Sequence, residues 1–155
     1  MAELQVNIRP MEETDLDAVL KVERDAFQSP WQRETFQKEL NENHFAHYLV
    51  AETNEEVIGY CGVWVVLDDA HITNIAILSS MRGAKVGAAL LAKSLTMAKT
   101  YGARQLSLEC RVSNQAAQAL YKKFGFVEGG LRKNYYRDNH EDALVMWRKL
   151  DDWDE

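Results

Sequence analysis

The chain has 155 residues, of which 46% are hydrophobic and 27% are charged, and these are ordinary values for a globular protein. Composition gives no reason to expect disorder, and the length fits one domain that buries about two-thirds of its unfolded surface. The net charge of −6, from 18 basic and 24 acidic residues, argues against direct nucleic-acid binding, which needs a basic face.

Targeting signals and metal motifs are not visible. Residues 1–10 lack the basic and apolar pattern of a signal peptide, and no apolar run approaches the length of a membrane span. Cys61 and Cys110 lie in apolar surroundings without metal-like spacing, which is typical of small core residues in a reducing compartment. The histidines are not spaced as metal ligands either. We therefore expect a cytoplasmic protein with no membrane contact and no metal.

The N-terminal part predicts a strand and two helices. Residues 6–10 have the composition of a short strand. A first helix should begin at Thr14, whose spacing to Asp17 resembles a capping box. A second helix is expected over residues 28–40, with Ser29 as its N-cap.

The middle of the chain predicts strands followed by a helix. β-rich runs at 47–53, 57–67 and 71–78 are separated by short turns, which favours an antiparallel meander. Apolar residues then recur at helical spacing over 87–100, and Gly102 should end that helix.

The C-terminal part predicts a strand at 104–110, a helix at 113–124 and strands at 125–136 and 143–150. No repeat or linker interrupts the chain. One α+β domain with a central mixed sheet is the simplest architecture.

Residues 79–95 form a polar, glycine-marked turn that leads directly into an apolar helix. Neither the Walker nor the dinucleotide-binding glycine pattern is present. The first N–H groups of a helix lack internal partners, so this turn could hold a phosphate with help from Arg82 and Lys85. A turn that simply caps a buried helix explains the pattern equally well.

The strand at 104–110 and the helix after it carry candidate catalytic groups. Strand alternation places Glu109 on the same face as Arg111, so Glu109 is either the ion-pair partner of Arg111 or a general base for an amine. Tyr121, at the edge of the helix's apolar stripe, is either a packed residue or a phenol that points outward and returns a proton to a leaving thiolate. Ser113 or Asn114 can cap the helix.

Residues 108–126 (LECRVSNQAAQALYKKFGF) and 132–150 (RKNYYRDNHEDALVMWRKL), together with Arg82 and Gly87 in the pattern R/Q-x-x-G-x-G/A, resemble a known family. The chain is similar to the ribosomal-protein-alanine N-acetyltransferases (RimI-like) of the GCN5-related N-acetyltransferase (GNAT) superfamily. The similarity runs over residues 8–150. It departs from the pattern at Lys85, which takes the place of the first glycine.

The resemblance implies the GNAT fold, which is an α+β architecture with a central mixed, mostly antiparallel twisted sheet flanked by about four helices. It implies a single acetyltransferase domain over residues 1–155. The implied activity is direct transfer of acetyl from acetyl-CoA to the α-amine of a protein N-terminus, the N-terminal alanine of a small-subunit ribosomal protein. Acetyl-CoA is then the co-substrate, and no metal is required.

The resemblance also implies roles for individual residues. Glu109 would be the general base and Tyr121 the general acid. Acetyl-CoA would be bound by Ile75, Ala76, Ile77, Arg82, Gly83, Ala84, Lys85, Val86, Gly87, Ala88 and Asn114. The peptide groove would be bordered by Trp31, Asn134, Tyr135 and Tyr136.

Two alternatives remain open at this point. The acceptor could be a lysine side chain, a polyamine or a small amine, or the protein could be a non-catalytic acetyl-CoA-binding interaction module. The oligomeric state is undetermined. For Lys85 we expect ordinary backbone torsions, with the ammonium extended toward solvent or a phosphate.

Overall fold

The computed structural model describes residues 5–82 and 85–154. Contacts between Cα atoms divide the chain into two compact units. The first comprises the described residues of Met1–Trp64 and Thr73–Ser94, and the second those of Val65–Ile72 and Leu95–Glu155. We describe each unit by itself.

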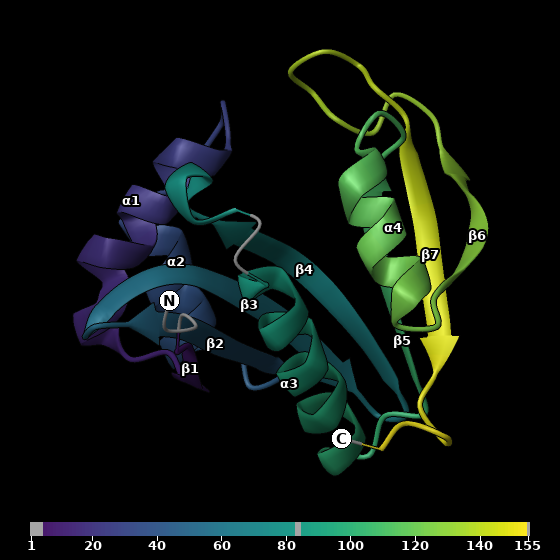
Figure 1. The fold of residues 1–155 in the computed structure, drawn as a ribbon, viewed down its shortest axis with the longest axis horizontal. Coiled ribbons are helices and arrows are strands. Elements are labelled where there is room, and N and C mark those ends of the chain that lie inside the picture. The colour runs from purple at the N-terminus through teal and green to yellow at the C-terminus, as the bar shows by residue number, and fades with distance from the viewer. Residues whose placement is uncertain (1–4, 83–84, 155) are drawn as a thin grey trace. The chain divides into compact units, whose positions relative to one another are not determined.

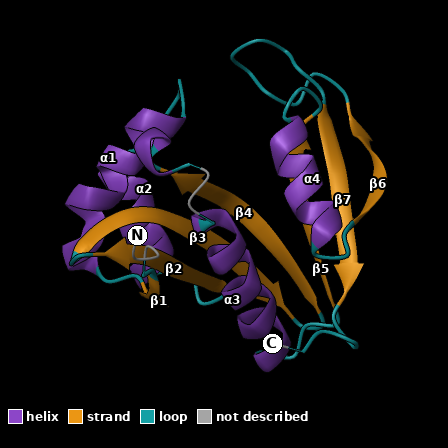
Figure 2. Ribbon diagram, viewed as in Figure 1, coloured by secondary structure: helices purple, strands orange, loops and turns teal. Residues whose placement is uncertain are grey.

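The described residues form seven strands, four α-helices and two short 3-10 helices (Figures 1 and 2). In chain order these are β1 (Asn7–Pro10), η1 (Glu13–Asp15), α1 (Leu16–Ala26), α2 (Arg33–Asn41), β2 (Ala46–Thr53), β3 (Glu56–Val66), β4 (Asp69–Ile77), η2 (Ser79–Met81), α3 (Val86–Thr100), β5 (Gln105–Arg111), α4 (Gln115–Lys123), β6 (Val127–Arg132) and β7 (Ala143–Lys149). The strands are hydrogen-bonded in the order β1-β2-β3-β4-β5-β7-β6. β1–β2, β2–β3, β5–β7 and β6–β7 are antiparallel and β4–β5 is parallel, so the predicted mixed α+β sheet is confirmed.

In the first unit, α1 and α2 pack on one face of the sheet. Apolar side chains of α1 recur at helical spacing and are fully buried, as Leu16 and Val19 show. They share a core with residues of β2 and β3, and the rings of Phe36, Tyr48 and Tyr60 meet within this core. Period-two alternation thus directs one side of these strands at α1 and α2.

The start of α3 packs on the opposite face of β3. The hydroxyl of Ser94 donates to the sulfur of Cys61 at 3.3 Å, and Leu90 lies against Gly59. A Cβ on Gly59 would come within 2.9 Å of the carbonyl oxygen of Ala76, so β3, β4 and α3 approach closely because residue 59 has no side chain. At its other end, α3 stops before Gly102, whose φ of 98° confirms the predicted helix stop.

The prediction that Thr14 begins the first helix with Asp17 in a capping box is wrong. Thr14 lies inside η1, and the backbone N–H of Glu12 donates to the carboxylate of Asp15 at 2.8 Å. Asp15 also accepts two hydrogen bonds from Arg9. α1 itself begins at Leu16, with Asp15 as its N-cap.

The prediction that Ser29 caps the second helix is also wrong. The cap of α2 is Gln32, in extended conformation with φ −88° and ψ 163°. The backbone N–H of Trp31 donates to the carboxylate of Glu23 at 2.8 Å, and this contact holds the preceding residues outside the helix. A tertiary contact, which local sequence does not reveal, sets the boundary.

In the second unit, α4 lies along β5, β7 and β6 (Figure 2). Its end is attached to β7 by Arg148, whose Nη1 donates to the carbonyl of Phe124 at 2.6 Å. The predicted strand over 125–136 is too long, since β6 ends at Arg132. Asn134 follows with φ 54°, a left-handed conformation that a strand does not contain.

Candidate active site

Glu109 is placed by the alternation of β5. The residues at 106, 108 and 110 are buried and those at 107, 109 and 111 point to the other face, as predicted from the period of two. The side chain of Glu109 is only 8% exposed. The second unit thus holds a carboxylate that solvent reaches poorly.

Among the described residues, His71 and Arg132 pair with Glu109, and Arg111 does not. Nε2 of His71 lies 2.9 Å from Glu109 Oε2, and Nε of Arg132 lies 3.1 Å from Glu109 Oε1. His71 reaches Glu109 because β4 and β5 run parallel with His71 opposite Ser107. The predicted alternative, a Glu109–Arg111 ion pair, is therefore wrong.

His71 also bridges to Ser107. Its Nδ1 lies 3.1 Å from the hydroxyl oxygen of Ser107. A neutral imidazole with its proton on Nε2 satisfies both contacts, since Nε2 then donates to Glu109 and Nδ1 accepts from the serine. The side chain of His71 is 36% exposed, so this row of Ser107, His71 and Glu109 extends from a buried carboxylate to solvent.

Arg111 instead organises the loop between β6 and β7. Its guanidinium donates to Asp138 and Asn139, at 2.9 and 3.1 Å, and lies 4.0 Å from the ring centroid of Tyr136. A second carboxylate in this loop, that of Glu141, lies 3.4 Å from Arg111 Nη1. The loop that carries the predicted peptide-contacting tyrosines is thus attached to the strand that carries Glu109.

Besides burial, the negative charge of Glu109 contributes to the raised pKa of both Tyr135 and Tyr136. The pKa of Tyr135 is raised first by burial and then by the negative charge of Glu109. Burial is likewise the main cause of the raised pKa of Tyr136, with a smaller contribution from Glu109. The two rings meet edge to face with centroids 5.1 Å apart. Asn134, the third residue of this group, is exposed, and its backbone N–H donates to Asp142 at 2.9 Å.

Tyr121 is the buried residue of α4. It is 5% exposed, and its ring packs against Phe126 with centroids 5.8 Å apart. Ala117, Leu120 and Phe124, the predicted stripe, are only partly buried.

Asn114 is the N-cap of α4. Its side-chain oxygen accepts from the backbone N–H of Ala117 at 3.1 Å, so of the two predicted caps it is Asn114 that serves and not Ser113. The cap uses the carbonyl end of the amide. Asn114 is an exposed residue, and its Nδ2 donor takes no part in the cap.

In the first unit, the residues expected to bind acetyl-CoA follow β4 into α3. The β4–β5 ladder covers Asp69, Ala70 and His71, so the backbone of residues 75–77 lies beyond it. Ala76 is buried in the core of the first unit, whereas Ile75 and Ile77 are partly exposed. Strand backbone outside a ladder offers N–H and C=O groups to a ligand.

The turn before α3 carries the remaining predicted residues. Arg82 is exposed with extended torsions, Val86 is buried, and Gly87 and Ala88 lie in the first turn of α3. Gly83 and Ala84 lie outside the described residues.

Lys85 corrects our expectation of ordinary backbone torsions. Its φ is 63°, in the left-handed region. Its carbonyl accepts from the N–H of Ala89 at 3.1 Å, so Lys85 immediately precedes the helix and its side chain is exposed. A lysine thus occupies a position whose torsions favour the glycine of the family pattern.

Trp31, predicted to border the peptide, lies in the segment between α1 and α2. Its ring packs against Phe36 with centroids 5.3 Å apart, and its backbone N–H is bound to Glu23. Trp31 belongs to the first unit and the tyrosine loop to the second.

Sequence reasoning missed His71 and Arg132 as neighbours of Glu109. His71 comes from β4 and Arg132 from the end of β6, so both contacts depend on strand pairing between distant segments. The polar face of β5 was visible in the sequence, but its partners required the strand order.

The two cysteines are poor candidates for catalysis. Burial raises the pKa of the Cys61 thiol to about 12 and also raises that of Cys110, so neither sulfur is a ready nucleophile.

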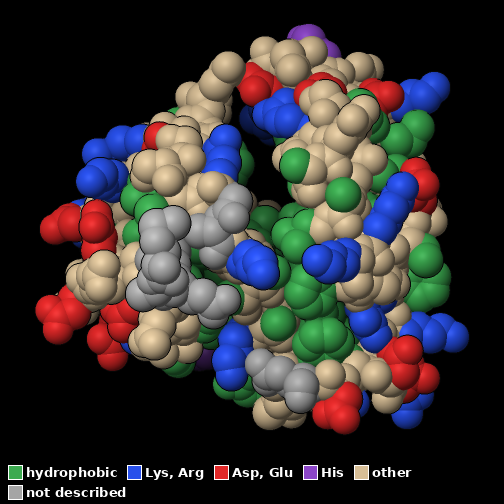
Figure 3. Space-filling model, viewed as in Figure 1, with side chains coloured by type: hydrophobic (Ala, Val, Ile, Leu, Met, Phe, Trp, Pro, Cys, Tyr) green, Lys and Arg blue, Asp and Glu red, His purple; other side chains and the backbone are tan. Residues whose placement is uncertain are grey.

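Among residues 5–82 and 85–154, no group of three His, Cys, Asp or Glu side chains is arranged to hold a metal ion. Within the same ranges, no helix has the length and hydropathy needed to cross a bilayer. Acidic and basic side chains are interspersed over the face drawn in Figure 3.

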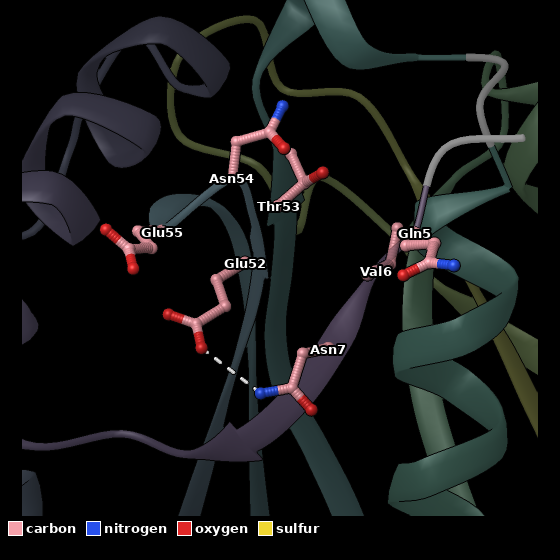
Figure 4. A pocket seen from close by; sticks show the side chains of 7 residues that line it. All are labelled: Gln5, Val6, Asn7, Glu52, Thr53, Asn54 and Glu55. Atoms are coloured by element: carbon pink, nitrogen blue, oxygen red, sulfur yellow. Dashed lines mark hydrogen bonds between the residues drawn. The ribbon is translucent and has the colours of Figure 1, made fainter. Parts of the chain in front are cut away.

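A hollow of about 400 Å³ lies in the first unit, away from the predicted site residues (Figure 4). Its lining comes from the start of β1 with the two residues before it, and from the end of β2 with the turn after it. Asn7 donates to Glu52 within this lining at 3.1 Å. None of its lining residues belongs to the candidate site.

Comparison with known proteins identifies the family. The sequence profile of the Acetyltransferase (GNAT) family matches residues 16–126, more than half of the chain. The chain belongs to this family. The expected family and activity class are confirmed: the protein is an acetyl-CoA-dependent N-acetyltransferase.

The alignments with similar GNAT proteins cover nearly the whole chain. A Bacillus subtilis (strain 168) protein, provisionally named ribosomal protein bS18-alanine N-acetyltransferase, is 53% identical over 140 residues, which cover 90% of this chain and 93% of that protein. The Escherichia coli (strain K12) ribosomal protein bS18-alanine N-acetyltransferase is 36% identical over 141 residues, covering 90% and 94%. The crystal structure of an Escherichia coli ribosomal-protein-S18-alanine N-acetyltransferase superposes with a TM-score of 0.86 at 33% identity, covering 97% of both chains. The expected GNAT fold is thereby confirmed.

Proposed function

We propose that this protein acetylates the α-amine of a protein N-terminus, and that its acceptor is the N-terminal alanine of ribosomal protein bS18. The observation that carries the acceptor is the extent of the similarity, since the two relatives named for this substrate align with 90% of the chain. The proposal includes a single acetyltransferase domain over residues 1–155.

Acetyl-CoA is the acetyl donor of the family, and the residues present fit it. Beyond the β4–β5 ladder, the backbone of residues 75–77 has hydrogen-bonding groups for the pantetheine arm. The first turn of α3, from Val86 to Ala88, offers N–H groups to the pyrophosphate, and Arg82 and Lys85 add positive charge. Gly83 and Ala84 complete the proposed loop. On α4, the Nδ2 of Asn114 is a further donor.

Glu109 is the proposed general base. An α-amine has an unperturbed pKa of about 8, so a carboxylate needs to give only modest help in deprotonating the ammonium form, directly or through a water. Each of the two oxygens of Glu109 has one described partner. Because a carboxylate has about four acceptor sites, acceptor sites remain for the ammonium or for a bridging water. His71, bound to Glu109 and partly exposed, lies on the path toward solvent.

The transfer then proceeds in two bond changes. The neutral amine nitrogen attacks the thioester carbonyl carbon, forming the C–N bond, and the tetrahedral intermediate collapses with cleavage of the C–S bond and loss of the second nitrogen proton to solvent. The departing sulfur takes a proton from the hydroxyl of Tyr121, the proposed general acid, and solvent then returns a proton to the Tyr121 phenolate. The high pKa of the buried cysteines supports this direct route over one through an acyl-enzyme.

Trp31 and the loop residues Asn134, Tyr135 and Tyr136 are the proposed peptide contacts. Burial and the charge of Glu109 raise the pKa of Tyr135, and the two tyrosine rings present edges and faces suited to a peptide backbone and small side chains.

The test is coenzyme A release with matched acceptors. A peptide with the N-terminal residues of bS18 should release the thiol, whereas the same peptide with a blocked N-terminus should not. Spermidine and free lysine should be poor acceptors, because an amine of pKa about 10.4 demands more from the base. Release with the amines but not with the free peptide would show a small-amine enzyme, and acetyl-CoA binding without any release would show a non-catalytic module.

A further inference from the structure

Glu23 is a buried carboxylate that the proposed mechanism does not use. It lies on α1, and the residue is 2% exposed. One oxygen accepts from the backbone N–H of Trp31 at 2.8 Å, and the other accepts from the hydroxyl of Tyr60. Neither partner is a cation, and burial raises the pKa of Glu23.

A carboxylate in this position costs stability. Taking a carboxylate out of water is unfavourable even when hydrogen bonds satisfy it, and an apolar side chain of similar volume is often as stable or more so. The surrounding core of the first unit is apolar and aromatic, with Phe36 beside Tyr60. Packing alone would favour a leucine or methionine at residue 23.

The hydrogen bonds of Glu23 reach two parts of the proposed site within the first unit. On one side is the backbone of Trp31, in the segment proposed to border the peptide. On the other, the Tyr60 hydroxyl accepts from the side-chain nitrogen of Asn74 at 2.5 Å. Asn74 lies in β4 and immediately precedes Ile75, the first of the three β4 residues proposed to bind acetyl-CoA.

Within this network, the hydrogen bond between Glu23 and Trp31 involves a backbone N–H, whereas the bonds of Tyr60 join side chains. Residues 27–32 contain no helix or strand, so they have no regular ladder to define their path. The Glu23–Trp31 hydrogen bond and the packing of Trp31 on Phe36 fix the path of this segment. Without it, the segment would have to pay the entropy of ordering when the peptide binds.

We propose that Glu23 is a positioning residue that fixes the Trp31 segment for the peptide acceptor. The inference rests on the proposed function, which makes this segment a peptide contact. Glu23 touches neither acceptor nor acetyl-CoA in this assignment. It acts through the backbone of residue 31.

Two variants of Glu23 separate this role from a general structural one. Glu23→Met removes both acceptors while retaining an unbranched side chain of similar length. Glu23→Gln keeps one oxygen, which can continue to accept from Trp31. Glu39→Met is the matched control, because Glu39 of the same unit also accepts from a tyrosine hydroxyl, that of Tyr48, but has no backbone partner in the segment.

For Glu23→Met we expect the KM for the peptide to rise at least about tenfold, the factor for losing a hydrogen bond to a charged acceptor. The kcat and the Kd for acetyl-CoA should stay at wild-type values, and Glu23→Gln should restore most of the peptide KM. Hydrogen exchange at the Trp31 amide should accelerate in Glu23→Met and remain slow in Glu23→Gln.

Several results would overturn the proposal. These are an unchanged peptide KM in Glu23→Met, a matching loss of acetyl-CoA affinity, or an equal KM increase in Glu39→Met. If Glu23→Met does not fold, fast Trp31 exchange in the wild-type protein would overturn it instead. A wild-type protein that turns over no peptide refutes the proposed function, whereas Trp31 exchange still measures whether Glu23 holds the segment.

Discussion

At Lys85 the side chain departs from the glycine of the family pattern, but the backbone has a conformation typical of glycine. Its φ of 63° is the conformation that glycine adopts without cost and that other residues adopt at about 1 kcal/mol or more. The sequence revealed the substitution but not the torsion, because a lysine is compatible with ordinary torsions in most turns. The carbonyl of Lys85 begins the hydrogen-bonding of α3, and this fixes the conformation.

Substitution at residue 85 should therefore report on backbone strain. We expect Lys85→Gly to keep or raise the free energy of unfolding, by up to about 1 kcal/mol, and Lys85→Val to lower it by about 1–2 kcal/mol, since β-branched residues tolerate positive φ least. Arg82→Val is the control, because Arg82 has an extended conformation with φ −66°. Urea denaturation of the three variants measures the effect, and equal losses for both valines would exclude strain at Lys85.

The proposed acid and base make separate predictions. Glu109→Gln should lower kcat about 100- to 10,000-fold, the usual range for a general base, and Tyr121→Phe should lower it by a similar factor. Glu128→Gln is the matched control, as its carboxylate has only an exposed ion pair with Lys122 in the described structure. Steady-state kinetics with saturating peptide and acetyl-CoA measure kcat. If either Glu109→Gln or Tyr121→Phe retained the wild-type kcat, that residue would not have the proposed catalytic role.

The neighbours of Glu109 mark how far sequence reasoning reaches at this scale. Period-two alternation correctly predicted the face of β5 on which Glu109 lies. It could not predict His71 and Arg132, because contacts across strands depend on pairing that local patterns do not encode. Arg111 was the nearest cation in sequence, yet it pairs with the loop at 136–141.

At the scale of elements, the existence of the helices and strands could be predicted, but the starts of α1 and α2 could not. The two helices of the N-terminal part were expected from apolar spacing and are present. Their first residues are set by Asp15 with Arg9 and by Glu23 with Trp31, which are tertiary contacts. α4 began where the sequence indicated, since its cap, Asn114, acts within three residues.

The Asn114 cap allows its structural and ligand-binding roles to be separated. Asn114→Ala should lower the free energy of unfolding by about 1 kcal/mol, because it removes the oxygen that accepts from Ala117. Asn114→Asp keeps that oxygen but removes the Nδ2 donor, so stability should be preserved while acetyl-CoA affinity falls about tenfold. Gln115→Ala, next in the helix, is the control.

Calorimetric titration with acetyl-CoA and urea denaturation distinguish these outcomes for residue 114. If Asn114→Asp binds acetyl-CoA as the wild type does, Asn114 is a cap and contributes no donor to the ligand.

At the scale of the whole molecule, acid stability depends on the ion pair that joins β1 to the first helix. Arg9 donates to both oxygens of Asp15 at 2.8 Å, and this, with the N–H of Glu12, holds the pKa of Asp15 below its usual 3.8. The unfolded chain therefore binds this proton first as the pH falls. The stability from Asp15 is fully present above about pH 4 and is lost as the pH falls through the folded-state pKa.

We expect the free energy of unfolding to fall less between pH 5 and pH 3, roughly, in Asp15→Asn than in the wild type. Glu23 contributes in the opposite sense, since its pKa is raised and its contribution diminishes as the pH rises through that value. Asp17→Asn, on an exposed position of α1, controls for the loss of one negative charge. Urea denaturation across this pH range would contradict the assignment if Asp15→Asn and the wild type showed equal slopes.

The central claim, acetyl transfer to a protein N-terminus, is tested most directly by locating the acetyl group in a product. The acceptor is a peptide with the N-terminal residues of bS18 and an added internal lysine, incubated with the protein and acetyl-CoA and sequenced by tandem mass spectrometry. We predict a single acetyl group on the α-amine of the first residue and none on the lysine. Acetylation of the lysine, with the α-amine left free, would contradict the claim.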